Sequence, residues 1–278
     1  MNDFTLITLV KGRAKQLANL LEAATASNPT PSEIIVVIMD DASIDYTEIN
    51  HISVRCIRLN EPVLALAKAR NMGAQTASSE NLVFLDVDCI CSPTLFANLL
   101  SRLTRNNIVS ARARYLDHVP EHGKYQELAI QAVEHPKRAS LPVDTPVQWK
   151  HFWSLVFAMK RNHFFSIGGF DSNFSGYGAE DTDFAYRHDQ AEGRLVFCND
   201  EVLHQYHTKY SPPINYLTDI IHNAEVFFRK HGVFPMYGWL KQFSEMGLIV
   251  IDTKTGTIRL RRHPTNQDFE NCFSKSVY

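Results

Sequence analysis

Cysteine is scarce in this sequence, and its few copies form no recognisable metal or disulfide pattern. The chain of 278 residues has five cysteines, an odd number, and no Cys-x-x-Cys occurs. Cys89 and Cys91 are one residue apart, and the other three are scattered. We interpret all five as reduced thiols, which predicts a cytoplasmic protein without a zinc site.

Long apolar runs are missing as well. No stretch approaches the roughly 18 apolar residues that a membrane helix needs, and the amino-terminal residues lack the basic start of a signal peptide. A small basic group, formed by Arg259, Arg261 and Arg262, is either a solvated surface or a contact with anionic lipid. The expected location is therefore cytoplasmic, with peripheral contact to the inner face of the membrane as the additional possibility.

The sequence has no surplus of either charge and no phosphate-binding glycine loop. Lys and Arg number 28 against 30 for Asp and Glu, a net charge of -2, which argues against general nucleic-acid binding. Neither Gly-x-x-x-x-Gly-Lys-Ser/Thr nor Gly-x-Gly-x-x-Gly follows the first apolar run. These absences exclude P-loop and dinucleotide-binding proteins.

Apolar runs and helical patterns alternate through the first part of the chain. Runs typical of buried strands cover residues 4–10, 33–39, 54–59 and 81–85, and helical spacing covers residues 14–26 and 64–77. Apolar strands with helical connections indicate a mostly parallel sheet covered on both faces. We therefore predict an α/β fold whose ligands bind beyond the carboxyl ends of the strands.

Acidic residues follow two of these strands. Asp40, Asp41 and Ser43 follow the second strand, and Asp86 and Asp88 follow the fourth. Alternation places Asp86 and Asp88 on one side of the chain, where the two charges repel each other unless a cation lies nearby. Such oxygen ligands suit Mg²⁺ or Mn²⁺. The alternative is a strand that runs into an ordinary polar loop, because Asp is common in turns.

A second acidic cluster lies at residues 180–183. Glu180, Asp181 and Asp183 follow a glycine-aromatic-glycine loop, and a helix is expected at residues 183–190. Any one of these carboxylates can cap the helix start. Clustering also raises carboxylate pKa values and can leave one group poised as a base.

The remaining segments are less informative. Residues 116–147 are polar, and we expect part of them to be a mobile lid. Strands are expected at residues 108–115, 149–159 and 194–198, and helices at 93–103, 161–167 and 214–232. Residues 234–243 are interpreted as an aromatic packing flap, with contact to the acceptor or the membrane surface as the alternative. Residues 248–260 are interpreted as a hairpin, and the final residues as frayed.

Taken together, the chain from residue 4 to about 232 resembles the inverting, metal-dependent glycosyltransferases of family 2, which have the GT-A fold. It is especially similar to the branch that shares a carboxyl-terminal catalytic segment with β-1,4-galactosyltransferases and chondroitin-type polymerases. The resemblance rests on four segments. Asp86-Val87-Asp88 matches the Asp-x-Asp motif, and residues 176–181 match Trp-Gly-Gly/Ala-Glu-Asp with Tyr177 in place of Trp. Residues 33–43 match the uridine-binding strand, and residues 68–73 match the Ala-Arg-Asn-x-Gly helix.

The resemblance implies a role for each matching residue. On the nucleotide side, Asp41 would accept the uracil N–H with support from Asp40 and Ser43. Arg70, in the helix that also carries Lys68, would reach the diphosphate or brace Asp86. The residues assigned to donor binding are Asp40, Asp41, Ser43, Lys68, Arg70 and Asp86.

On the metal side, Asp88 would bind Mn²⁺ or Mg²⁺, and Asp86 would hold the ribose or the water shell of the metal. A histidine after a later strand would complete the site. His204 fits the family pattern better, and His207 is the alternative. Asp181 would be the general base, and Glu180 would bind sugar hydroxyls.

The implied protein is a Rossmann-like GT-A domain at residues 1–232, with a nucleotide half at 1–115, an acceptor half at 148–232, and an acceptor-side extension at 233–278 that packs on it. It would move galactose, N-acetylgalactosamine or N-acetylglucosamine from a UDP-sugar to a saccharide or lipid-linked acceptor, in surface polysaccharide synthesis.

The alternatives are a sugar-phosphate nucleotidyltransferase and a catalytically idle sugar-nucleotide-binding module. The first should have a glycine-rich basic loop after the first strand, and Lys11-Gly12-Arg13 is a poor match.

Overall fold

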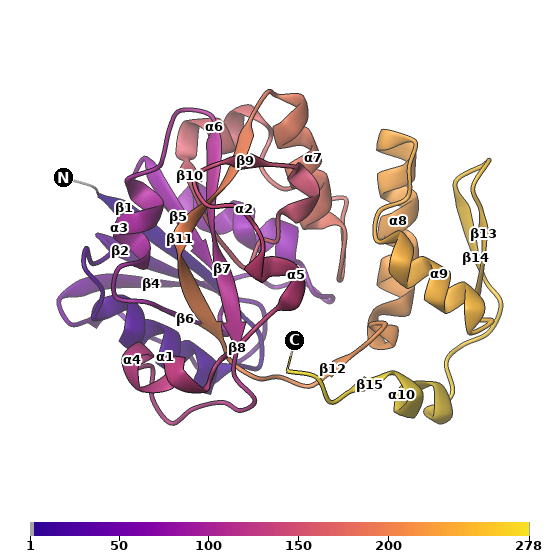
Figure 1. Ribbon diagram of the computed structural model, residues 1–278, viewed down its shortest axis with the longest axis horizontal. Coiled ribbons are helices and arrows are strands. Elements are labelled where there is room, and N and C mark those ends of the chain that lie inside the picture. Colours follow the sequence, from indigo (N-terminus) through magenta and orange to yellow (C-terminus); the bar gives the residue numbers. More distant parts are fainter. Residues whose placement is uncertain (1–2, 278) are drawn as a thin grey trace.

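The computed structural model describes residues 3–277, in which one large mixed sheet is flanked by helices (Figure 1). The principal strands lie in the order β3-β4-β2-β1-β5-β10-β7-β11-β6. Their bounds are β3 Glu48–Ile49, β4 Ile52–Arg58, β2 Glu33–Ile38, β1 Phe4–Val10, β5 Asn81–Leu85, β10 Val156–Lys160, β7 Asn107–Tyr115, β11 Arg194–His204 and β6 Cys89–Cys91. The α/β prediction is confirmed.

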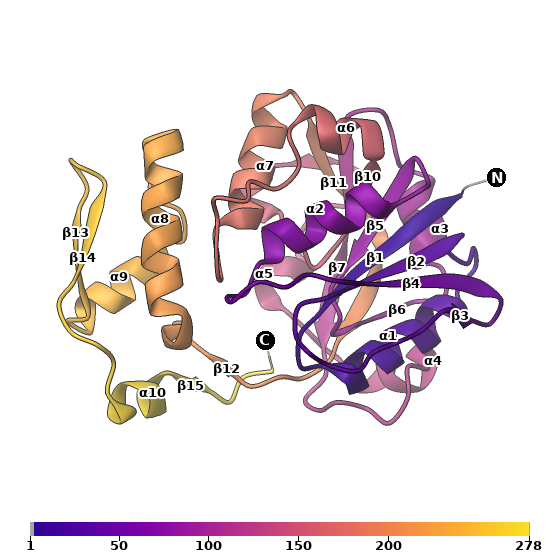
Figure 2. The same ribbon diagram turned by 180° about the vertical axis from the view of Figure 1, so that it is seen from behind.

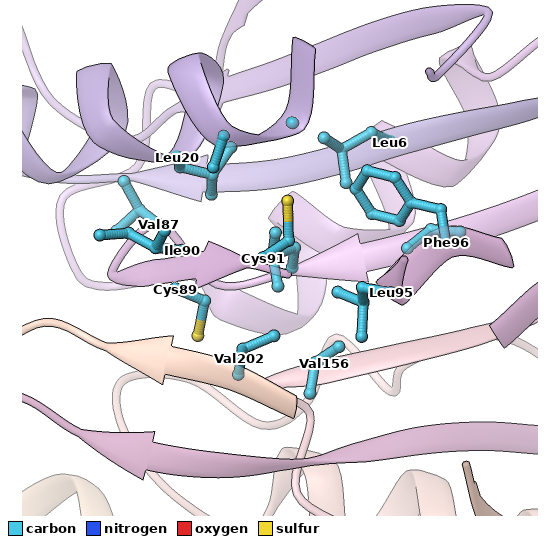
Figure 3. Packing of buried hydrophobic residues seen from close by; sticks show 14 of the residues in the cluster. Leu6, Leu20, Val87, Cys89, Ile90, Cys91, Leu95, Phe96, Val156 and Val202 are labelled. Carbon is cyan, nitrogen blue, oxygen red and sulfur yellow. The ribbon is translucent and has the colours of Figure 1, made fainter. Parts of the chain in front are cut away.

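The sheet is buried on both faces because helices cover each side. On one face α1 (Ala14–Thr25) and α3 (Leu95–Leu100) pack through Leu20 and Phe96 on Leu6 of β1, and Figure 3 shows this packing. On the other face lie α2 (Leu66–Thr76), α6 (Arg161–Ser166) and α7 (Glu180–Gln190), as Figure 2 shows from behind. Every residue of β1 and β2 is buried, as expected of central parallel strands.

Two strands differ from the expected pattern and shape the carboxyl edge. The strand expected at residues 149–159 is shorter, since Trp149–His151 form a 3-10 turn and β10 begins at Val156. β10 runs antiparallel to both β5 and β7. The short strand β6 was not expected, and it pairs antiparallel with β11.

The segment predicted as a lid has short elements of its own. They are α4 (Tyr125–Leu128), η1 (Ala129–Gln131), β8 (Val133–Glu134), α5 (Pro136–Ala139) and β9 (Pro146–Val147). β8 pairs with β7, and β9 pairs with β11. These contacts hold its later part against the sheet, and movement as a lid stays a prediction.

A second body, the C-terminal module (residues 214–274), stands beside the sheet and faces α7 (Figures 1 and 2). It comprises η3 (Ile214–Tyr216), α8 (Leu217–His231), α9 (Tyr237–Glu245), the hairpin β13 (Ile249–Asp252) and β14 (Thr257–Leu260), α10 (Asn266–Cys272) and β15 (Phe273–Ser274). It has a hydrophobic core of its own, which includes Ile220, Leu240 and Ile249. β15 pairs with β12 (Lys209–Tyr210), at the chain's entry to the module.

Two expectations for this region are corrected. The aromatic flap is the helix α9, because its apolar side chains Leu240 and Phe243 fall on one buried face. Of the final residues, expected to be frayed, residues 266–274 form α10 and β15, and α10 starts with a capping box between Thr265 and Asp268. The expectation for residue 278 lies outside the described residues. The division after residue 232 stays a prediction, and α8 shares the core of the module. Among residues 3–277 no helix is both long and apolar enough to cross a bilayer.

Candidate active site

Asp88 owes its position to the turn that joins β5 to β6. β5 ends at Leu85, and the Cys89 N–H donates to the Asp86 carbonyl at 2.9 Å, which closes a tight turn. β6 then pairs with β11 so that Cys89 lies opposite His204, and the Gln205 N–H donates to the Asp88 carbonyl at 2.7 Å. Strand register therefore brings the Asp-x-Asp turn and the end of β11 together.

Asp88, His204 and His207 form what we call the metal triad. The Nε2 atoms of His204 and His207 lie 3.5 and 3.6 Å from the two carboxylate oxygens of Asp88. One ligand atom from each side chain lies within 4.8 Å of the others. A carboxylate and two imidazoles form a mixed oxygen and nitrogen donor set that can hold a divalent transition-metal ion such as Mn²⁺ or Zn²⁺.

The electrostatics of the metal triad favour the ligating forms of its members. Burial and the nearby Arg13 charge lower the pKa of His204, although Asp88 opposes them, which favours the neutral imidazole. The pKa of His207 is lowered by burial and Arg13 in the same way. Burial opposes ionisation of Asp88, but His204, Arg13 and His207 together hold its pKa below the ordinary value. A charged carboxylate and neutral imidazoles are the forms that bind metals.

Arg13 is a site residue that the sequence interpretation missed. It comes from the loop between β1 and α1 and makes an ion pair with Asp88. The signal was present, because Lys11-Gly12-Arg13 follows the first strand at the same sheet edge as Asp86. A guanidinium at this place can also serve an anionic ligand.

Arg70 of α2 connects the two acidic clusters. It is only 3% exposed, and its Nη2 and Nη1 lie 3.4 Å from Asp86 and 3.1 Å from Glu180. Burial raises the pKa of Asp86 to about 7, with a contribution from Asp88 and against the effect of Arg70. The pKa of Arg70 is raised by Asp86, Glu180 and Asp181 despite burial. One guanidinium thus bridges residues from distant parts of the sequence.

The acidic pair, Glu180 and Asp181, opens helix α7. Ala179 precedes it with φ of 68°, in the left-handed region, so the chain turns sharply before the helix begins. Oδ1 of Asp181 accepts hydrogen bonds from the N–H and hydroxyl of Thr182 at 2.7 and 3.3 Å. Burial raises the pKa of both carboxyls, and at Glu180 the charge of Asp181 adds to the effect, while Arg70 opposes it at both.

Two cavities meet at this edge. The first has a volume of about 600 Å³ and contains the metal triad and Arg13. The second, of about 670 Å³, contains the acidic pair and the chain from Phe234 to Trp239. Arg70, Asp86, Trp153, Tyr177 and Trp239 are among the residues that line both. The arrangement can hold a charged group on a cation and a second ligand beside a carboxylate.

Aromatic side chains of the C-terminal module border this junction. The rings of Tyr177 and Tyr216 stack at a centroid distance of 4.4 Å, and Trp239 lies 6.3 Å from Tyr177. Tyr216 lines the first cavity. The sequence interpretation gave Tyr216 no role, because a residue so distant along the chain carries no local sign of the site. For the segment that contains Trp239 it left packing and acceptor contact as alternatives.

The other predicted donor residues lie at or near the same edge but line neither cavity. Asp40 accepts hydrogen bonds from the backbone N–H groups of Gly12 and Ala42 at 2.5 and 3.1 Å. Asp41 and Ser43 are exposed in the loop after β2. Lys68 pairs with Glu61 at 2.7 Å. Their roles in donor binding stay predictions.

Comparison with known protein families identifies the chain. Residues 5–165 match the model of glycosyl transferase family 2, and residues 134–210 match a model described as the N-terminal domain of galactosyltransferase. The chain belongs to glycosyl transferase family 2. The second match supports the predicted branch with a galactosyltransferase-like segment, and both matches end before the C-terminal module.

Curated relatives are distant. Validoxylamine A glucosyltransferase of Streptomyces hygroscopicus subsp. limoneus is 25% identical over 202 residues, 62% of this chain and 44% of that protein. Polypeptide N-acetylgalactosaminyltransferase 3 of Mus musculus is 25% identical over 190 residues, 58% of this chain and 29% of that protein. This family 2 chain therefore spans less than half the length of these relatives.

Solved structures agree on the GT-A fold. GalNAc-T7 with UDP, GalNAc and Mn²⁺ has a TM-score of 0.57 at 19% identity, over 88% of this chain and 54% of that one. Mannosyltransferase PcManGT from Pyrobaculum calidifontis, in complex with GDP-Man and Mn²⁺, has a TM-score of 0.55 at 16% identity, over 88% of this chain and 68% of that one. At these identities the likeness shows the fold.

Proposed function

We propose that this protein is a metal-dependent, inverting glycosyltransferase that moves a hexose from a UDP-sugar to a hydroxyl of a saccharide or lipid-linked acceptor. One observation carries the proposal: the cavity of the metal triad and the cavity of the acidic pair meet at Arg70 and Asp86. A donor diphosphate in the first cavity then lies next to an acceptor in the second. Membership of family 2 supports the same reaction class.

The residues present fit a divalent ion. Asp88, His204 and His207 would hold Mn²⁺ or Mg²⁺, their ligand atoms being within 4.8 Å of one another. The nitrogen donors favour Mn²⁺ over Mg²⁺, which prefers oxygen. When bound, the ion supplies Lewis-acid stabilisation of the negative charge on the departing UDP. Arg13 adds a fixed positive charge beside Asp88.

Asp181 is the proposed general base. Its carboxylate takes the proton of the acceptor hydroxyl while that oxygen attacks the anomeric carbon, and the bond from this carbon to the UDP oxygen breaks. The products are the glycoside with inverted configuration and UDP, and Asp181 carries the proton. Glu180 is fixed by Arg70 at 3.1 Å and is proposed to bind sugar hydroxyls. No covalent intermediate is required.

The proposed hexoses are galactose, N-acetylgalactosamine and N-acetylglucosamine, and the proposed acceptor belongs to surface polysaccharide synthesis. The relatives named above include a glucosyltransferase and an N-acetylgalactosaminyltransferase, so the donor test includes UDP-glucose. The cytoplasmic location and peripheral membrane contact stay predictions.

A donor panel tests the proposal. The protein is incubated with Mn²⁺, each of the four UDP-sugars and a set of saccharide acceptors, and UDP release is measured with and without EDTA. We expect release with one donor, loss in EDTA, and recovery on adding Mn²⁺. In a parallel incubation with UTP and a sugar phosphate, release of diphosphate would instead identify a nucleotidyltransferase. UDP-sugar binding without turnover across the panel would identify an idle binding module.

A further inference from the structure

Helix α8 holds the loop that leads into the acidic pair. Asn223, at the middle of the helix, is fully buried. Its Nδ2 donates to the carbonyls of Ser175, Tyr177 and Gly178 at 2.9, 3.3 and 2.8 Å. Its Oδ1 accepts the Ser175 N–H at 3.2 Å. A single amide therefore fixes the backbone of three loop residues.

Asp219, one turn earlier on α8, holds the same loop from a second point. Its Oδ2 accepts the Tyr177 N–H at 3.2 Å. A Cβ added to Gly176 would come within 2.2 Å of Asp219 Cγ, and the φ of Gly176 is 76°. Only glycine permits this approach, so the glycine that precedes Tyr177 allows α8 to pack directly on the loop.

The end of α8 also contacts α7, the helix that begins with the acidic pair. Asp183 is fully buried, and its Oδ1 accepts from Lys230 Nζ at 2.6 Å and lies 2.8 Å from His231 Nε2. Its Oδ2 accepts from Arg187 Nε at 2.8 Å. Buried charges of this kind are costly to separate from their partners. α8 thus contacts the chain on both sides of residues 180 and 181.

We infer that α8 is an intramolecular clamp that positions the acidic pair, and that Asn223 is its principal positioning residue. The inference rests on the proposed function, since it concerns how Asp181 is aimed at the acceptor. α8 lies outside both segments that match family models, which end at residues 165 and 210. The clamp is therefore a contribution of the C-terminal module to the site.

The physical reason is the shape of the loop. Gly176, Gly178 and Ala179 all have positive φ, and residues 175–178 lie in no helix or strand. Gly176 forms a bridge with Ala65, in which its N–H donates to the Leu64 carbonyl at 2.8 Å. The side chains of α8 supply further partners, on Ser175, Tyr177 and Gly178. Leu217, Ile220 and Ala224 pack α8 into the core of the module, so the loop is bonded to a helix that is itself held in place. Small displacements of a base cost large factors in rate.

The test compares Asn223→Ala with Arg229→Ala, an exposed residue of the same helix. We expect Asn223→Ala to lower kcat about 10- to 100-fold, with the Kd for UDP in the presence of Mn²⁺ within about twofold of wild type. Arg229→Ala should match wild type in both. An unchanged kcat, or a parallel loss of UDP affinity and unfolding temperature, would overturn the inference.

A second pair of variants covers the case in which Asn223→Ala does not fold. Asp219→Asn keeps a side-chain oxygen for the Tyr177 N–H, whereas Asp219→Ala removes it. We expect Asp219→Asn to retain most of kcat and Asp219→Ala to lose at least about 5-fold of it. Equal kcat values for the two would overturn the inference.

Hydrogen exchange separates failure of the clamp from failure of the proposed function. In Asn223→Ala the amides of residues 175–182 should exchange faster, while those of residues 89–91 keep their protection. Arg229→Ala should leave both segments unchanged. If the wild type transfers no sugar but this pattern appears, the clamp stands and the function is wrong. If exchange is unchanged, the clamp is wrong whatever the activity.

Discussion

The metal triad and the acidic pair lie at one edge of the sheet, but different parts of the chain fix them. Asp88 and His204 are set by the pairing of β6 with β11, so backbone hydrogen bonds determine their separation. Glu180 and Asp181 are set by a left-handed turn whose loop is bonded to side chains of α8. The metal side is thus built by the sheet, and the base side by a second body packed against it.

This difference predicts that the two sides can be damaged separately. Arg70 is their buried link, since it contacts Asp86 on one side and Glu180 on the other. Substitutions on the metal side should remove ion and UDP binding. Substitutions on the base side should leave UDP binding and remove transfer.

The largest expected effect comes from Asp181→Asn. Loss of the general base should lower transfer about 10³-fold, within the usual range for such groups, while the Kd for UDP with Mn²⁺ stays within about twofold of wild type. UDP release and calorimetry on the same preparation measure the two quantities. Transfer at the wild-type rate would show that another residue is the base.

The variants His204→Ala and His207→Ala each remove one imidazole from the metal triad. Each should weaken Mn²⁺ binding at least about 10-fold, since even outer-shell partners of metal ligands cost that much. Titration of Mn²⁺ followed by electron paramagnetic resonance measures the affinity. His122→Ala, which changes a histidine outside both cavities, is the control. A variant that binds Mn²⁺ as wild type does would remove its histidine from the triad.

The acceptor side is tested at Tyr237, an exposed residue of α9 that lines the second cavity and not the first. Tyr237→Ala should raise the acceptor KM about 3- to 10-fold, the scale of one aromatic contact. UDP binding should not change. Val233→Ala, at a nearby exposed position outside both cavities, should behave as wild type. An effect on UDP affinity rather than acceptor KM would place the donor in the second cavity.

The smallest expected effect is a shift in pH dependence. Burial raises the pKa values of Glu180 and Asp181, so these carboxyls keep their protons to a higher pH than free ones do. Because the base works when ionised, kcat/KM should rise with pH around a midpoint above the ordinary value of about 4. Arg70→Gln removes the positive charge that lowers the pKa of both carboxyls and should move this midpoint to higher pH. If the midpoint does not move, the rise of kcat/KM with pH belongs to another titrating group.

The comparison of the two sides also explains what the sequence could reveal. Asp86, Asp88, Glu180 and Asp181 were identifiable because each pair stands beside a local landmark, either a strand end or a glycine loop. The alternation of strands and helices predicted the layers of the fold. Short-range patterns were enough for both.

Contacts between residues far apart in the sequence could not be predicted. Arg13 meets Asp88 across 75 positions, and Asn223 meets Ser175 across 48. Arg13 follows the first strand at the sheet edge of Asp86, but nothing in the local sequence pairs it with Asp88. A buried Asn on an amphipathic helix looks like any other polar position. The strand β6 was missed because it is only three residues long. α10 was missed because its start depends on one capping box rather than on apolar spacing.

Calorimetry of UDP binding is the most direct test of the account, which holds that a divalent ion on Asp88, His204 and His207 retains the nucleotide diphosphate beside Asp181. UDP is titrated into the wild type with Mn²⁺ and again with EDTA. We expect UDP to bind with Mn²⁺ and its affinity to be at least about 10-fold lower in EDTA, because the metal bridges the diphosphate to the protein. Equal affinity under both conditions, or no binding under either, would contradict it.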